Sequence, residues 1–202
     1  MTRAALKPPA ETLDSLLAAL RACRACAAHL PLGPRPVVRG LPSARLLVIS
    51  QAPGTRVHET GLSFNDRSGD RLRDWLGIDR ATFYDERRVA ILPMGFCYPG
   101  RDAKGGDLPP RPDCAPLWHA RVLAHWPAIE LTLLVGSYAI DYYLEGRAAP
   151  TMTETVEAWR DFEPSVLPLP HPSWRTTAWE KKNPWFGRTL VPALRRRVAA
   201  LV

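Results

Sequence analysis

The chain of 202 residues lacks a long apolar run. A segment that spans a membrane needs roughly 20 consecutive apolar residues, and the sequence contains no such stretch. Its first residues also lack the basic start, short apolar stretch and small-residue cleavage site of a secretory signal. We therefore expect a cytoplasmic protein with no membrane partner. In that reducing compartment the four cysteines are expected to be thiols or metal ligands rather than disulfides.

The sequence also lacks a Gly-rich phosphate-binding loop, which argues against the common nucleotide-binding α/β enzymes. It has no internal repeat, no low-complexity linker and no break in composition. We therefore expect a monomer with a single domain over residues 1–202, of which residues 1–10 form a flexible tail.

Positive charge and proline are present in excess. Lys and Arg number 27 against 20 Asp and Glu, a net charge of +7, and there are 21 prolines. A basic surplus suits a polyanionic partner such as nucleic acid, although merely solvated arginines give the same surplus. Composition thus makes DNA a candidate partner, and the motifs must distinguish a DNA-binding protein from one with merely solvated arginines.

Hydrophobic spacing predicts that strands alternate with helices. Short runs that are apolar on both faces, typical of strands in a covered parallel sheet, occur at residues 46–49, 89–92, 131–135 and 165–170. Helical spacing occurs at residues 11–23, 70–76, 114–125, 137–144 and 191–202. The alternation predicts the α/β class, as a three-layer α/β/α sandwich around a central, mostly parallel four-stranded sheet.

The four cysteines are regularly spaced. Cys23 and Cys26 form a C-x2-C pair, and Cys97 and Cys114 follow with 16 residues between them. Zinc and an iron–sulfur cluster both accept four thiolates, whereas four unrelated buried thiols are the alternative explanation. The spacing makes these residues candidate metal ligands and does not distinguish the metals.

Two polar segments follow predicted strands. The first contains SQAPG at residues 50–54 and continues through ETGLSFNDRSGDRL at residues 59–72, and the second is LPHPSWR at residues 169–175. Because α/β proteins bind ligands in the loops at the carboxyl ends of their strands, these segments are candidate site loops.

In these segments and in its cysteine spacing, the chain resembles the uracil-DNA glycosylase superfamily. Within that superfamily it resembles a divergent member of the iron–sulfur branches that are called families 4 and 5. Those proteins carry a motif close to G-E-A-P-G or G-L-A-P, then T-G-x-x-F-x-G-x-x-G-x-x-L, and later H-P-S or H-P-A. The matching positions here are residues 51–54, 60–61, 64, 68–69, 72 and 171–173. The resemblance covers about residues 20–195.

The resemblance implies a DNA glycosylase of base excision repair that hydrolyses the N-glycosidic bond of uracil or another deaminated base. Its partner would be DNA containing such a base. It also implies a [4Fe–4S] cluster on Cys23, Cys26, Cys97 and Cys114, with zinc as the alternative. A DNA-binding relative without glycosylase activity, and an unrelated nucleotide-binding α/β enzyme, are the other hypotheses.

The same resemblance suggests His171, Gln51 and Asp66 as catalytic residues. His171 would donate a hydrogen bond to the negative charge that develops on the departing base. The Gln51 amide would contact the base or the attacking water, and the candidates for activating that water are Asp66, His58 and Glu59.

Other residues are expected to hold the base and the DNA. Base contacts are expected from Gln51, Ala52, Pro53, Gly54 and Phe64. DNA contacts are expected from Ser173, Trp174, Arg175, Lys181 and Lys182. The two lysines belong to WEKKNPWF, residues 179–186, which is either an aromatic and basic strip facing DNA or a packed surface loop.

Three positions depart from the family pattern. Ser50 replaces the first glycine of the motif, and Gln51 stands where many members have glutamate. Pro93 stands where the family usually has an asparagine that reads the uracil edge, and proline has no side-chain hydrogen bond to offer. A shifted strand, another polar group or a different base would each account for this position.

Overall fold

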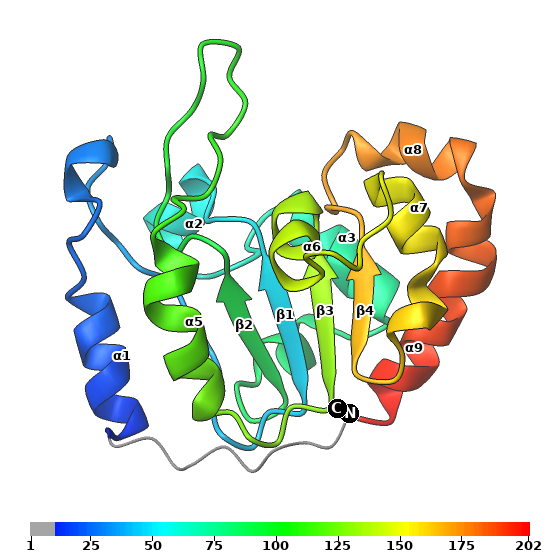
Figure 1. Cartoon of the computed structure of the whole chain (residues 1–202), viewed down its shortest axis with the longest axis horizontal. Helices are drawn as coiled ribbons and strands as arrows, with labels where there is room; N and C mark the ends of the chain where they lie inside the picture. The colour runs from blue at the N-terminus through cyan, green and yellow to red at the C-terminus, as the bar shows by residue number, and fades with distance from the viewer. Residues whose placement is uncertain (1–10) are drawn as a thin grey trace.

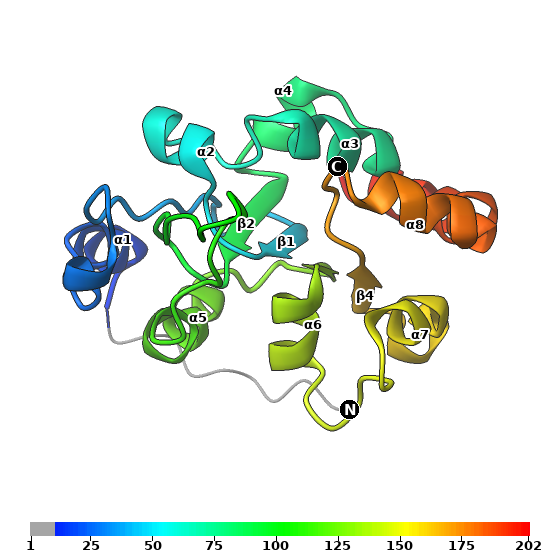
Figure 2. The ribbon, with the colours of Figure 1, turned by 90° about the horizontal axis from the view of Figure 1, so that it is seen from above.

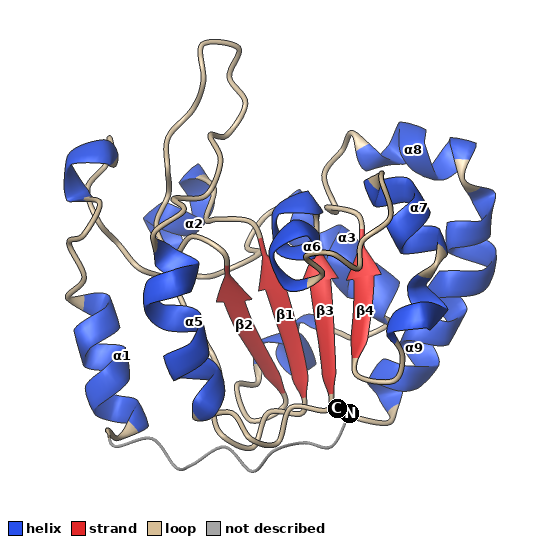
Figure 3. Cartoon of the chain, viewed as in Figure 1, coloured by secondary structure: helices blue, strands red, loops and turns tan. Residues whose placement is uncertain are grey.

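The computed structural model describes residues 11–202, so the tail expected at residues 1–10 lies outside the described part (Figure 1). Four parallel strands form one sheet in the order β2-β1-β3-β4. Their bounds are β1 Leu46–Ser50, β2 Val89–Pro93, β3 Leu131–Val135 and β4 Val166–Leu169. Helices lie on both faces of this sheet, which confirms the predicted α/β/α sandwich (Figures 2 and 3).

The helices form two layers, which are clearest when the sheet is viewed from above (Figure 2). One layer contains α5 (Cys114–Ala124), α6 (Ser137–Tyr143) and α7 (Met152–Glu157), with α1 (Leu13–Arg21) packed outside α5. The other contains α2 (Thr55–Thr60), α3 (Arg67–Leu76), α4 (Arg80–Tyr84), α8 (Thr176–Lys182) and α9 (Val191–Ala199). Short helical turns lie at Ala27–His29, Trp159–Phe162 and Phe186–Leu190.

The sequence predicted the strands and longer helices because burial dictates their pattern. Residues 46–49 of β1 are at most 1% exposed, as expected for a strand covered on both faces. Thr12 caps α1 by accepting the Ser15 N–H at 3.2 Å. The sequence analysis missed α2, α4, α7 and α8, whose five to seven residues show only a weak period, although it predicted α6, which has seven residues.

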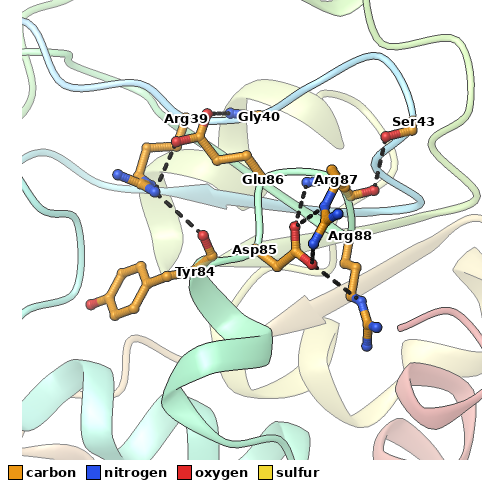
Figure 4. Close-up of polar contacts among 8 residues, drawn as sticks. All are labelled: Arg39, Gly40, Ser43, Tyr84, Asp85, Glu86, Arg87 and Arg88. Atoms are coloured by element: carbon orange, nitrogen blue, oxygen red, sulfur yellow. Dashed lines mark hydrogen bonds and ion pairs between the residues drawn. The ribbon is translucent and has the colours of Figure 1, made fainter.

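The amino ends of β1 and β2 are held by a network of charged groups (Figure 4). Arg39 pairs with Glu86 at 2.8 Å and donates to the Tyr84 carbonyl at 3.3 Å. Asp85 pairs with Arg87 at 2.9 Å and with Arg88 at 3.4 Å. These contacts link the chain that enters β1 to the turn that enters β2.

The carboxyl ends of the strands lead into long connections. After β2, residues 94–113 rise above the sheet before α5 begins, as the green loop at the top of Figure 1 shows. β1 connects to helices on one face and β3 to α6 on the other, so a crevice is expected between these strands. Among residues 11–202, none of the helices has the length and apolar character needed to cross a membrane.

Candidate active site

A pocket of about 420 Å³ lies at this carboxyl edge, lined by the loops that follow β1, β2 and β4. It brings together ten residues that the sequence suggested. They are Gln51, Ala52, Pro53, Gly54, Phe64, Asp66, His171, Ser173, Trp174 and Arg175. Lys181 and Lys182 are exposed at the end of α8 and do not line this pocket, and neither do His58 and Glu59.

The first turn of the site extends the strand pairing beyond β1. The Ser50 carbonyl accepts the Met94 N–H at 2.8 Å, and the Gln51 carbonyl accepts the Gly95 N–H at 3.0 Å. Within the described chain, the Gln51 side chain lines the pocket without a hydrogen-bond partner. Its backbone is therefore fixed while its amide stays available to a ligand.

Phe64 has a left-handed backbone conformation, with φ of 56°, which is uncommon for a bulky residue. Its carbonyl accepts a hydrogen bond from Arg73 at 3.3 Å, and its ring lies edge-on to Phe83 with 5.9 Å between centroids. A Cβ on Gly69 would lie 1.8 Å from the Phe64 oxygen, so only glycine fits there. Gly69 of the motif thus leaves the room that the Phe64 backbone needs at the pocket.

Asp66 caps the helix that follows Phe64. Its Oδ1 accepts the Gly69 N–H at 2.9 Å, which satisfies one of the free N–H groups in the first turn of α3. The carboxylate also faces the pocket, but one of its oxygens is committed to the cap.

His171 follows β4 and is half-buried at the pocket. Gly136, at the end of β3, has φ of 90°, and a Cβ there would lie 3.3 Å from the His171 Cβ. Burial lowers the pKa of His171, and the carboxylates of Asp66 and Asp107 oppose that shift. The ring is thus neutral at pH 7, and in the described chain its nitrogens have no hydrogen-bond partner.

An arginine that the sequence analysis missed connects the two motif segments by hydrogen bonds. Arg71 of α3 donates to the Ser173 carbonyl at 3.0 Å and to the Thr177 hydroxyl. The His171 carbonyl in turn accepts the Ser173 N–H at 2.8 Å and the Thr176 hydroxyl. No sequence signal distinguishes Arg71 from the other arginines of its helix, because its partners lie about a hundred residues away.

The rim of the pocket carries an exposed aromatic residue. Trp174 is 78% exposed, and the Arg175 guanidinium lies 5.5 Å from its ring centroid. By contrast, the tryptophans of segment 179–186 pack inward on Phe186, and the Trp179 indole donates to Thr153 at 2.8 Å. That segment is largely helical rather than a loop, and its aromatic rings belong to the packing.

Pro93 lines the pocket where β2 ends, and a buried polar pair stands behind it. His119 Nε2 lies 3.1 Å from the Pro93 carbonyl, and His119 Nδ1 lies 2.6 Å from the Tyr143 hydroxyl. Because a carbonyl only accepts, Nε2 carries the proton and Nδ1 accepts from Tyr143. Burial lowers the pKa of His119 to about 4, so this wall of the pocket is held by a neutral imidazole.

The loop after β2 contributes pocket residues that the sequence analysis also missed. They are Arg101, Gly105, Gly106 and Asp107. Their GRDAKGGD sequence is typical of an ordinary polar turn, and only the fold brings it over the motif loops.

The four cysteines are free thiols that come from distant parts of the chain and lie within electrostatic reach of one another. Burial raises the pKa of Cys97 to about 11 and of Cys114 to about 12, and Cys23 and Cys26 add to both shifts. The backbone N–H groups of Arg35 and Phe96 act in the opposite direction, lowering the pKa of Cys97 and of Cys114 respectively. Among residues 11–202, no three Cys, His, Asp or Glu side chains already meet the geometry of a single bound metal ion.

Comparison with known families agrees with this geometry. The model of the uracil DNA glycosylase superfamily matches residues 38–195. The match includes both motif segments, the pocket, Cys97 and Cys114, and begins after Cys23 and Cys26. The chain belongs to the uracil DNA glycosylase superfamily.

Proposed function

We propose that this protein is a DNA glycosylase that hydrolyses the N-glycosidic bond of uracil or another deaminated base in DNA. The observation that supports this best is the meeting of both motif segments at one pocket of about 420 Å³, within the usual size of small-molecule sites. A base inside a duplex must leave the stack to reach such a pocket, at a cost of a few kcal/mol.

His171 is proposed to stabilise the departing base. As the bond to C1′ breaks, negative charge develops on the base, and a neutral imidazole N–H is well suited to donate to it. The lowered pKa of His171 and the free hydrogen-bonding capacity of its ring support this role.

Phe64 and Gln51 are proposed to hold the flipped base. The Phe64 ring offers a flat apolar face whose backbone is fixed by Gly69 and Arg73. The Gln51 amide both donates and accepts, so it suits more than one base edge. The turn through residues 52–54 completes this wall.

The rim is proposed to contact the DNA. Trp174 has the exposure and size of a side chain that fills the space left by a flipped base, and Arg175 and Ser173 lie beside it for phosphate contacts. Lys181 and Lys182 on α8 would add contacts to the backbone that do not depend on sequence.

We propose that the four cysteines hold a [4Fe–4S] cluster and that the chain belongs to the iron–sulfur part of the superfamily. The packing of Cys26 and Cys97 in one buried cluster, and the electrostatic proximity of all four cysteines, support this. The cluster would cross-link three chain segments and so stabilise the fold. Zinc is the alternative occupant of the same thiolates.

Base excision tests the proposed function. The protein is incubated with single-stranded and duplex oligonucleotides that contain uracil, hypoxanthine or xanthine, and abasic sites are then cleaved with alkali. We expect excision of at least one base by the wild type, and a loss in His171→Ala. His125→Ala is the matched control, since His125 lies at the end of α5, away from the pocket, with its Nε2 unpartnered.

Two other results would overturn the proposal. Tight binding to abasic DNA without excision of any base would indicate a DNA-binding relative that lacks catalysis. Neither excision nor preferential binding to such DNA would indicate an enzyme acting on other ligands.

Metal analysis tests the cluster separately. We expect protein purified without oxygen to be brown and to contain about four irons per chain. Cys114→Ala should lose the iron and much of its solubility. Wild-type protein that contains stoichiometric zinc and no iron would contradict the cluster and indicate a zinc site instead.

A further inference from the structure

The loop between β2 and α5 is tied into a defined turn above the pocket. Asp102 Oδ1 accepts the N–H groups of Lys104 and Gly106, both at 2.8 Å. The Asp102 N–H also donates to the Gly106 carbonyl at 2.8 Å, and Arg101 and Asp107 pair as an isolated antiparallel bridge. The residues that follow this turn therefore have a set position over the site.

Asp107 lies at the end of this turn, and its carboxylate lines the pocket. Its Oδ2 lies 3.5 Å from the point that a Cβ on Gly54 would occupy, so it stands over the first motif turn. It is close enough to His171 to affect the pKa of that ring. Its cationic neighbour is Arg101, 3.7 Å from Oδ1, and the Asp107 side chain remains 46% exposed and open to water.

The other acidic and basic candidates for activating water are less suitable. Asp66 uses an oxygen to cap α3, and its removal would damage the first turn of that helix. Glu59 is exposed and His58 packs near Tyr98, with 6.0 Å between ring centroids, and neither lines the pocket. Asp107 combines a place in the pocket with side-chain oxygens that cap no helix.

We infer that Asp107 is the catalytic carboxylate that activates the attacking water. This inference rests on the proposed glycosylase function. Water forms a bond from its oxygen to C1′ of the deoxyribose as the C1′–N bond breaks, and the pair of that bond leaves with the base. The water proton passes to the Asp107 carboxylate, and the base anion, stabilised by His171, takes a proton from solvent. The products are the free base and an abasic sugar.

Paired substitutions in this loop test the inference. Asp107→Asn removes the charge and keeps the shape, and Asp102→Asn removes the same charge from the same loop. Because an amide oxygen in place of the Asp102 carboxylate can still accept both N–H groups, the turn is expected to survive. In single-turnover excision, Asp107→Asn should lower the rate of the chemical step by about 10²-fold or more, with Asp102→Asn close to wild type.

Two further measurements separate chemistry from loop structure. Binding to DNA with an abasic site should be kept in Asp107→Asn, since no water is activated in that complex. Added formate, a small external base, should restore part of the activity of Asp107→Ala and none of the activity of His171→Ala.

Each remaining outcome has a definite meaning. Near wild-type excision by Asp107→Asn, with His171→Ala slow, overturns the inference and leaves the glycosylase function intact. Equal losses of the excision rate in Asp107→Asn and Asp102→Asn would assign the loop a purely structural role, and this result also overturns the inference. Wild-type protein that excises no base overturns both proposals.

Discussion

The two edges of the sheet differ in how several of their polar side chains are paired. At the amino edge, Arg39, Asp85 and Glu86 pair with other charges or with backbone groups (Figure 4). At the carboxyl edge, the side chains of Gln51 and His171 face the pocket with no hydrogen-bond partner in the described chain. Since an unpaired polar group in a half-buried site costs free energy, such groups are expected where a ligand completes them. Paired groups indicate structure, and unpaired groups that share a pocket indicate function.

The largest expected effect is on catalysis at the carboxyl edge. His171→Ala should lower the rate of the chemical step by about 10²–10³-fold, the loss typical for one donor to a developing anion. Its urea unfolding midpoint should stay near wild type, because in the described chain its ring makes no hydrogen bond to lose. If His171→Ala unfolded at a lower urea concentration than the wild type but kept the wild-type excision rate, the contrast between the two edges would be contradicted.

The next effect concerns stability and pH. Because burial lowers the pKa of His119 to about 4, the unfolded chain, with a histidine pKa near 6.5, binds this proton more readily. Stability should therefore fall as the pH drops from about 6.5 towards 4, by up to about 3 kcal/mol. Urea unfolding at several pH values measures this, and His119→Gln should show a smaller change over the same range.

A smaller effect is expected from the proposed stacking face. Phe64→Leu keeps an apolar side chain but loses the ring, so capture of the flipped base should weaken by about 1–3 kcal/mol. Single-turnover rates measured against enzyme concentration give that affinity. Phe83→Leu is the control, because Phe83 packs behind Phe64 without lining the pocket. Equal effects of both variants on capture would argue against stacking by Phe64.

The smallest effect is expected at the amino edge. Glu86→Gln weakens a partly exposed ion pair with Arg39, so the free energy of unfolding should fall by no more than about 1 kcal/mol. Excision should be unchanged, since Glu86 lies just before β2 begins, whereas the pocket lies where the strands end. Denaturant titration and the excision assay on the same preparation check both statements.

The sequence was informative about the pocket where a residue's role is local. Gly69 follows Asp66 by three residues, so a helix cap and a close approach to Phe64 fit within one short segment that a motif can preserve. Arg71 and Asp107 gave no such signal, because the contacts of Arg71 and the pocket position of Asp107 depend on chain segments far away in the sequence.

By itself the sequence determined the class of the fold, since runs that are apolar on both faces, such as residues 46–49, alternate with helical segments, as is typical of a parallel sheet covered by helices on each side. It also determined which loops carry the motif residues, because those loops follow the strands directly. Only the tertiary structure decided that Gly136 makes room for His171, that His119 holds the Pro93 carbonyl, and that the loop after β2 brings Asp107 over the pocket. The physical reason is range: periodicity and caps act over a few residues, whereas the order β2-β1-β3-β4 brings together side chains that are far apart in the chain.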